Sequence, residues 1–232
     1  MKLLTYKTNN LEKHQLGVLK NQFVYNLNNC FGNISLIDLI QIKNYQQQIS
    51  DFINNNTNCL KHEVKDITML PVIPKPTSFR DAYAFRQHVE TSRKNRGVNM
   101  IEEFDQFPVF YFSNHNAMFG DNQEIKLMPD HFQKLDFELE FAIIIGKGGK
   151  NILSKDADNH IAGLCILNDL SARKLQMEEM KLNLGPAKGK DFANVLGPYL
   201  VTTDELENKS IDTPFGKKYD LEMKCFVNGE LL

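Results

Sequence analysis

The sequence predicts an α+β fold with a mainly β core. Beyond residue 100, segments with the alternation or apolar runs of strands are separated by turns and short helical patterns. A doubly wound parallel sheet would instead need a regular helix after each strand, and that pattern does not occur. With 232 residues and 42% hydrophobic side chains, the chain is long enough to bury a core of its own.

The composition excludes several classes of partner. The 27 Lys and Arg residues nearly balance the 29 Asp and Glu residues, and no long run of one sign could follow nucleic acid or an anionic membrane. There is no apolar stretch of a signal peptide, and no run approaches the ~20 residues of a membrane span. We therefore expect a cytoplasmic protein. The four cysteines lack CxxC spacing, so neither disulfides nor zinc are expected, and Cys165 and Cys225 should pack as small apolar residues.

Residues 1–70 are predicted to form a small N-terminal domain without catalytic residues. The segment contains a strand-like piece at Phe23–Tyr25 and a helix that begins after Ser35, as its N-cap, and runs through Ile53. Three prolines then hold residues 71–76 extended, which is typical of a connector. The second domain is accordingly predicted to span residues 71–232.

This second domain is predicted to be a β core. Its expected strands are Phe107–Phe112, Leu135–Ile145, Ala162–Asn168, Tyr199–Thr202 and Leu221–Val227. Asn228-Gly229 then predicts a hairpin, yet only three residues follow it. We therefore expect the hairpin to lack an arm, and the core to be incomplete at its C-terminus because the chain is a fragment or ends early.

Acidic and apolar residues alternate along the expected strand 135–145. Residues two apart in a strand lie on one face, about 6.5 to 7 Å apart, so Asp136, Glu138 and Glu140 should project together. Such a row forms either a solvated outer face or a site for a hard cation such as Mg²⁺ or Ca²⁺. The alternation alone is compatible with both interpretations.

A second candidate lies where a buried strand is expected to lead into a helix. Asp169 stands at this junction, and Arg173 and Gln176 follow at spacings that place all three on one side. In one interpretation Asp169 or Ser171 caps the helix and Arg173 pairs with Asp169. In the other, Asp169 binds a metal while Arg173 and Gln176 bind an anionic or carbonyl oxygen.

Two further segments carry weaker signals. His88 is the only histidine that follows an acid and a tyrosine, Asp81 and Tyr83, within one short segment, although a lone histidine is more often structural than catalytic. The glycine-bounded loop before Lys190 could bring a lysine to a ligand. It lacks the ending of a phosphate-binding loop, so nucleotide binding is not supported.

Taken in order, five motifs resemble the fumarylacetoacetate hydrolase family. They are Asp81-Ala82-Tyr83 with Arg86-Gln87-His88, Pro108-Val109-Phe110-Tyr111, Asp136-Phe137-Glu138-Leu139-Glu140, Asn168-Asp169-Leu170-Ser171-Ala172-Arg173 with Gln176, and Gly189-Lys190. The likeness spans about residues 71–204, and five motifs in this order are hard to obtain by chance. Asn194 stands where fumarylacetoacetase members of the family have a threonine.

The resemblance implies a role for each of these residues. The implied metal ligands are Asp81, Glu138, Glu140 and Asp169, and the implied general base is His88. The residues implied to face the substrate are Tyr83, Tyr111, Arg173, Gln176 and Lys190. The resemblance also implies a mixed β-sandwich roll behind a small N-terminal domain, assembled as a homodimer.

The activity implied by the resemblance is that of a fumarylacetoacetase-like hydrolase in aromatic amino-acid catabolism. It would cleave a carbon–carbon bond in a 1,3-diketone, either fumarylacetoacetate or an acylpyruvate-like keto acid, with Mg²⁺, Ca²⁺ or Mn²⁺ as cofactor. One alternative is a hydratase, isomerase or decarboxylase of a 2-oxo acid, because the same groups serve any enolate. The other is an inactive metal-binding fragment.

Overall fold

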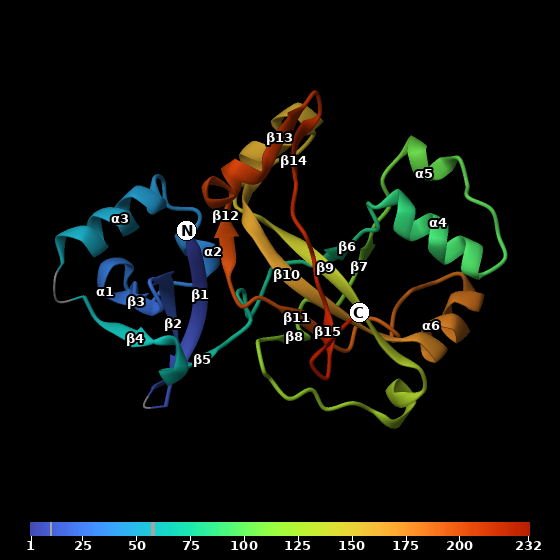
Figure 1. Cartoon of the computed structure of the whole chain (residues 1–232), viewed down its shortest axis with the longest axis horizontal. Helices are drawn as coiled ribbons and strands as arrows, with labels where there is room; N and C mark the ends of the chain where they lie inside the picture. Colours follow the sequence, from blue (N-terminus) through green and yellow to red (C-terminus); the bar gives the residue numbers. More distant parts are fainter. Residues whose placement is uncertain (10, 57–58) are drawn as a thin grey trace.

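One large sheet dominates the computed structural model, which describes residues 1–9, 11–56 and 59–232 (Figure 1). The N-terminal part supplies the strands β1 (Lys2–Thr8), β2 (Leu11–Lys20), β3 (Phe23–Asn26), β4 (Lys61–Glu63) and β5 (Ile67–Met69). Its helices are α1 (Asn28–Phe31), α2 (Leu36–Leu39) and α3 (Tyr45–Asn55). The strand expected at Phe23–Tyr25 is confirmed, whereas β1 was not predicted, because Leu3 to Tyr6 are buried without alternation.

The rest of the chain contains strands β6 to β16, of which β8 to β12 belong to that sheet. They are β6 (Arg80–Asp81), β7 (Tyr111–Phe112), β8 (Met118–Phe119), β9 (Leu135–Ile145), β10 (Ile161–Ala172), β11 (Asn194–Leu196), β12 (Leu200–Thr202), β13 (Ser210–Thr213), β14 (Gly216–Tyr219), β15 (Phe226–Val227) and β16 (Glu230–Leu231). The helices are α4 (Arg86–Asn95), α5 (Glu103–Gln106) and α6 (Arg173–Glu179). Within the described residues, no helix has both the length and the apolar character needed to cross a membrane.

The ten strands of the main sheet run in the order β4-β3-β2-β1-β12-β10-β11-β8, with β5 beside β1 and β9 beside β10. Strands β11 and β8 pair in parallel, and the other pairs in this sheet are antiparallel. Three two-stranded sheets, β6–β7, β13–β14 and β15–β16, complete the β structure. The predicted α+β fold with a mixed β core is thus confirmed.

The helix expected from Ser35 through Ile53 is in fact two helices. Ser35 caps α2 as predicted, because its side chain accepts a hydrogen bond from the amide of Asp38 while the Asp38 carboxylate accepts from the amide of Ser35. The chain then leaves the helix, and Asn44 adopts a left-handed φ of 58° before α3 begins. A single left-handed residue cannot continue an α-helix, so the prediction of one helix is wrong.

Several predicted strand boundaries need correction. The strand at Leu135–Ile145 is confirmed in full. Of the first expected strand only Tyr111–Phe112 forms a strand, and of the last only Phe226–Val227 does. The first is short because its partner β6 has only two residues. The strand expected to end at Asn168 runs on to Ala172, so Asp169 lies inside a strand rather than at a strand–helix junction.

The C-terminal hairpin forms with both arms. Phe226 pairs with Leu231 and Val227 with Glu230, while Asn228 and Gly229 have the positive φ values, 53° and 86°, that a type I′ turn requires. The turn prediction is confirmed. The expectation that the hairpin lacks one arm is wrong, because two residues are enough to form a short second strand.

The main core crosses the expected domain boundary. Strand β1 pairs with β12, where Leu3 stands opposite Leu200, and both side chains are fully buried. The same core cluster contains Leu16 from the N-terminal part together with Val72 and Leu167 from beyond the expected boundary. The sheet is therefore continuous from β4 to β8, while the division at residue 71 stays a prediction.

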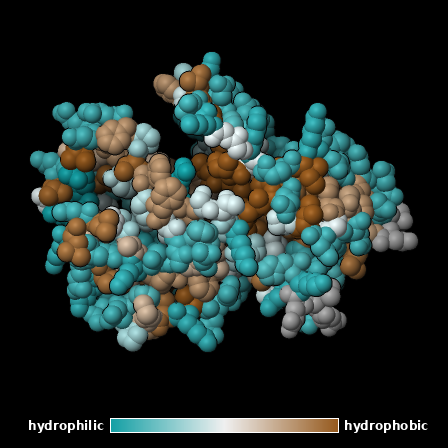
Figure 2. All heavy atoms as spheres, turned by 180° about the vertical axis from the view of Figure 1, so that it is seen from behind, coloured by the Kyte–Doolittle hydropathy of each residue, from teal (hydrophilic) through white to brown (hydrophobic). Residues whose placement is uncertain are grey.

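Strand β9 has two unlike faces. Glu138 lies opposite Asp169 and Glu140 opposite Leu167, so the acidic residues share the face of buried β10 residues. The apolar residues of the alternation face the other way, and Phe141, Ile143, Ile145 and Ile166 of β10 are exposed there. Seen from behind, hydrophobic side chains gather over the middle of the molecule (Figure 2). Because Glu138 and Glu140 are half-buried, the interpretation as a solvated face does not hold for them.

The crossing of β10 and β12 offers a test of the fold. A Cβ at Gly163 would lie 2.3 Å from the Val201 carbonyl oxygen, on the strand that joins the two parts of the sheet. We expect Gly163→Ala to lower the free energy of unfolding by about 1–3 kcal/mol through overpacking. The control Gly148→Ala meets no atom within 4 Å and should change it by less than about 0.5 kcal/mol. Urea unfolding of both variants decides this, and equal stabilities would contradict the observed packing.

Candidate metal centre

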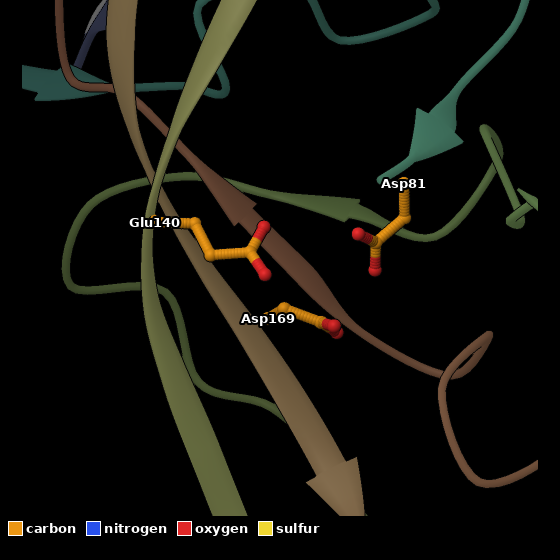
Figure 3. A group of neighbouring side chains, drawn as sticks. All are labelled: Asp81, Glu140 and Asp169. Carbon is orange, nitrogen blue, oxygen red and sulfur yellow. The ribbon is translucent and has the colours of Figure 1, made fainter. Parts of the chain in front are cut away.

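Three carboxylates from distant parts of the chain converge at one place. Asp81 ends β6, Glu140 lies on β9 and Asp169 on β10, and one oxygen of each lies within 4.8 Å of the others. Figure 3 shows the three side chains pointing toward a common space. The pairing of β9 with β10 fixes the relation between Glu140 and Asp169, and the short strand β6 brings Asp81 to face them.

Crowding of these carboxylates changes their protonation. Burial, followed by the charges of Asp81, Asp169 and Glu138, raises the pKa of Glu140 to about 8. Burial likewise raises the pKa of Asp169 to about 7, even though Lys190 opposes this shift. Like charges close together favour protonation unless a cation joins them. The cluster therefore holds protons near neutral pH in the absence of a metal.

Glu138 has a different environment from its neighbours. Its two carboxylate oxygens accept from Arg173 Nη2 at 2.7 Å and from Lys190 Nζ at 2.9 Å. Although burial opposes the change, these two cations lower the pKa of Glu138 to about 2. In this arrangement Glu138 anchors two cations beside the cluster, whereas the implied role as a fourth metal ligand stays a prediction.

Lys190 is the buried cation of the site. Its ammonium lies 2.5 Å from Asp169 Oδ2, and only 3% of the residue is exposed. The loop before it is held by Glu179 of α6, whose carboxylate accepts from the amides of Ala187 and Gly189. Gly189 is required here, because a Cβ would lie 2.7 Å from Gln176. The loop thus delivers a lysine to the carboxylates, as its position in the sequence suggested.

Tyr111 joins the centre through Asp81. Its hydroxyl donates a hydrogen bond to the Asp81 carboxylate, and the side chain is half-buried. Burial and then this hydrogen bond raise the pKa of Tyr111 above its usual value. The phenol is therefore held neutral and orients one carboxylate of the cluster.

Arg173 and Gln176 occupy the first two turns of α6. Arg173 donates to Asp136 at 2.8 Å, in addition to Glu138, and to the Gln176 amide oxygen at 3.2 Å. The interpretation in which Asp169 or Ser171 caps the helix and Arg173 pairs with Asp169 is wrong, because α6 has Ala172 as its N-cap and Arg173 pairs with Asp136 and Glu138. Asp136, which is not among the metal ligands implied by the resemblance, fixes the guanidinium.

The structure does not bring His88 and Tyr83 into contact with the cluster. His88 is exposed on α4, and Tyr83 is 50% exposed and stacks on Phe104. Among the described residues, no recorded hydrogen bond or ion pair links either side chain to the three carboxylates. Their implied roles as base and substrate contact stay predictions.

The donor set fits a hard divalent cation. Carboxylate oxygens are the ligands preferred by Mg²⁺, Ca²⁺ and Mn²⁺. Asp169 Oδ1 is buried without a hydrogen-bond partner among the described residues, as is the amide oxygen of Asn194, which stands opposite Asp169 on β11. Sequence reasoning noted Asn194 only as a departure from a threonine. Buried unpaired oxygens are costly, so a cation would stabilise this site.

Comparisons with known proteins show the family of the chain. Residues 77–232 match the family described as fumarylacetoacetate (FAA) hydrolase C-terminal. A mitochondrial oxaloacetate tautomerase of Xenopus laevis is 33% identical over 125 residues, which is 54% of this chain and 36% of that protein. A fumarylacetoacetase of Oryza sativa is 47% identical over 85 residues, which is 35% of this chain and 20% of that protein. The matched segments thus cover well under half of these two relatives.

Solved structures show the same fold. A fumarylacetoacetate hydrolase from Exiguobacterium antarcticum is similar with a TM-score of 0.70 and 22% identity, over 100% of this chain and 73% of that one. A maleylpyruvate hydrolase from Sphingobium, in complex with manganese (II) and pyruvate, has a TM-score of 0.62 and 16% identity, over 88% of this chain and 68% of that one.

The protonation of the cluster predicts how stability depends on pH and metal. The pKa of Glu140 is raised from 4.5 to about 8 in the folded chain, so the fold binds this proton more tightly than the unfolded chain. Without metal, the free energy of unfolding should therefore fall as the pH rises from 4.5 to about 8. Mg²⁺ should offset the loss, because it binds the deprotonated carboxylates, and stabilise by about 2.7 kcal/mol at a hundredfold excess over its Kd.

Thermal unfolding across this pH range, with and without Mg²⁺, measures both effects. Glu140→Gln should flatten the pH dependence and abolish the Mg²⁺ shift, while the exposed control Glu124→Gln should leave both unchanged. A full Mg²⁺ shift in Glu140→Gln would show that the ion binds elsewhere.

Proposed function

The chain belongs to the fumarylacetoacetate hydrolase family, and from this premise we propose that it is a metal-dependent hydrolase of 1,3-diketones. It cleaves a carbon–carbon bond in an acylpyruvate-like 2-oxo acid. The observation that carries the proposal is the meeting of Asp81, Glu140 and Asp169 beside the buried ammonium of Lys190. The names of relatives that act as hydrolases of such keto acids support it.

Asp81, Glu140 and Asp169 would hold the divalent cation, with Mg²⁺ as the first choice and Mn²⁺ or Ca²⁺ as alternatives. A cation bound there supplies Lewis acidity toward the two keto oxygens of the substrate. The hydroxyl of Tyr111 keeps Asp81 in position while this happens. Glu138 is the fourth ligand implied by the family resemblance.

Lys190 and Arg173 provide positive charge for the oxygens that become anionic. The ammonium of Lys190 has three N–H donors, and its ion pairs with Asp169 and Glu138 leave one of them for a substrate oxygen. A preorganised donor of this kind is worth about 2.7–4 kcal/mol in other enzymes. Arg173 with Gln176 would bind the substrate carboxylate.

His88 is the proposed general base. It would take a proton from the water that attacks one carbonyl, as the resemblance implies, with Tyr83 facing the substrate beside it. The side chain is exposed on α4 and carries no recorded hydrogen bond among the described residues, so it is free to meet a bound substrate. Catalytic hydrogen bonds often form only in the substrate complex.

An isomerase of a 2-oxo acid is the second candidate function. The similarity to an oxaloacetate tautomerase supports it, and so does the exposure of His88, because proton transfer at carbon needs no oriented attacking water. A hydratase, a decarboxylase or an inactive metal-binding fragment would use the same carboxylates. A homodimer, a cytoplasmic location and a role in aromatic amino-acid catabolism stay predictions.

Substitution of His88 tests the hydrolase mechanism. For the hydrolase, we expect His88→Ala to lower kcat for acetylpyruvate cleavage by about 10²–10⁴-fold, because a general base is lost. Mg²⁺ affinity should not change, since His88 contacts none of the three carboxylates. Cleavage is followed by loss of the diketone absorbance and metal binding by calorimetry.

The exposed histidine of β2, His14, provides the control His14→Ala, which should keep full activity. Normal cleavage by His88→Ala with normal metal affinity would rule out this mechanism. Enol–keto conversion of oxaloacetate without cleavage of any acylpyruvate would identify the isomerase instead.

A further inference from the structure

A pocket of about 260 Å³ adjoins the candidate metal centre. Its wall consists of β7 with the two residues after it on one side and the loop that carries Lys190 on the other. The lining residues are Tyr111, Phe112, Ser113, Asn114, Pro186, Ala187 and Asp191. Tyr111 belongs to both places, because its hydroxyl donates to Asp81. A substrate held at the carboxylates would therefore extend into this pocket.

In the described part of the chain, the pocket has one acidic residue in its lining and no basic one. Asp191 is half-buried in its wall, and none of the seven lining residues in the described chain is Lys, Arg or His. Burial and then Glu179 raise the pKa of Asp191, while His131 and Lys188 act in the opposite direction, and neither of these two residues lines the pocket. The hydroxyl oxygen of Ser113 is buried there without a hydrogen-bond partner among the described residues.

We propose that this pocket receives the acyl end of the diketone and selects a neutral end over a carboxylate. A carboxylate at the acyl end of the substrate would lose hydrating water in the pocket and would meet Asp191 instead of a cationic side chain. Both effects oppose binding. An alkyl end would instead pack on Phe112 and Pro186, and the Ser113 hydroxyl could meet one polar atom. The inference rests on the proposed function, because it takes the carboxylate cluster as the place where the keto oxygens bind.

The charges on the two sides of the site also give the substrate one orientation. Lys190 and Arg173 stand on the side of the carboxylate cluster, where the 2-oxo acid carboxylate would bind, whereas Asp191 stands in the pocket. An acylpyruvate with a neutral end has a single carboxylate, and only the cationic side accepts it. Specificity thus arises from a repulsive group as well as from attractive ones.

Two acylpyruvates with one carbon skeleton test this inference. Butanoylpyruvate ends in a methyl group and succinylpyruvate ends in a carboxylate at the same position. Calorimetry on the Mg²⁺-loaded chain should give a Kd for succinylpyruvate that is at least about tenfold weaker, because like charges meet in the pocket. The ratio of kcat/KM for cleavage should show the same preference.

Substitutions in the pocket should change the ratio of the Kd values of succinylpyruvate and butanoylpyruvate. Asp191→Asn removes the charge of this side chain without changing its size. It should reduce the difference in Kd between the two acylpyruvates, mainly because succinylpyruvate binds more tightly. Ala187→Lys adds a cation at the exposed rim and should act in the same direction. The control Glu178→Gln removes an exposed acid of α6 that does not line the pocket, and it should keep the wild-type ratio.

Binding and cleavage separate the two proposals. Equal or tighter binding of succinylpyruvate by the wild-type chain would overturn the inference, as would an unchanged ratio in both pocket variants. Butanoylpyruvate could bind more tightly than succinylpyruvate, lose this advantage in Asp191→Asn, and still not be cleaved. In that case the pocket inference stands and the hydrolase function fails. If neither compound binds, both fail.

Discussion

The register between β9 and β10 is the constraint on which the site depends. It sets Glu138 opposite Asp169 and Glu140 opposite Leu167, so two acids of an alternating strand face inward beside a third. A slip of one residue would turn these acids to the outer face and bring Phe141 and Ile143 inward. The long pairing from Leu135 to Ile145 makes such a slip costly, and the relative positions of Glu138, Glu140 and Asp169 therefore come from the sheet rather than from loops.

Charge balance explains why the remaining residues are where they are. Apart from Asp136, which is exposed to water beside Arg173, the centre has four carboxylates, Asp81, Glu138, Glu140 and Asp169, and two cations, Arg173 and Lys190, which leaves two negative charges. In the metal-free chain, protons neutralise part of this excess negative charge, as the raised pKa of Glu140 indicates. A single divalent cation carries the charge that would balance the group. Arg173 and Lys190 both bind Glu138 and keep it ionised. Glu140 and Asp169 remain available to a metal.

The sequence predicted those features that depend on local periodicity. The bounds of β9 followed from strict alternation, and the start of α2 from Ser35 and Asp38. It could not predict β1, which is buried on both faces, or the break at Asn44, which depends on one backbone angle. The approach of Asp81 to Glu140 came from a family resemblance, because no local pattern relates residues so far apart in the chain. The exposure of His88 likewise depends on tertiary contacts.

Two adjacent residues give the site its asymmetry. Lys190 is buried among the carboxylates, whereas Asp191 lines the neighbouring pocket, and the hydrogen bonds from the loop to Glu179 fix both. Because one loop carries both charges, the cation that balances the metal site and the anion that limits the substrate are positioned together. A change at residue 191 can therefore alter which substrate fits while Lys190 keeps the carboxylates in place. The sheet positions Glu140 and Asp169, and the loop after α6 positions Lys190 and Asp191.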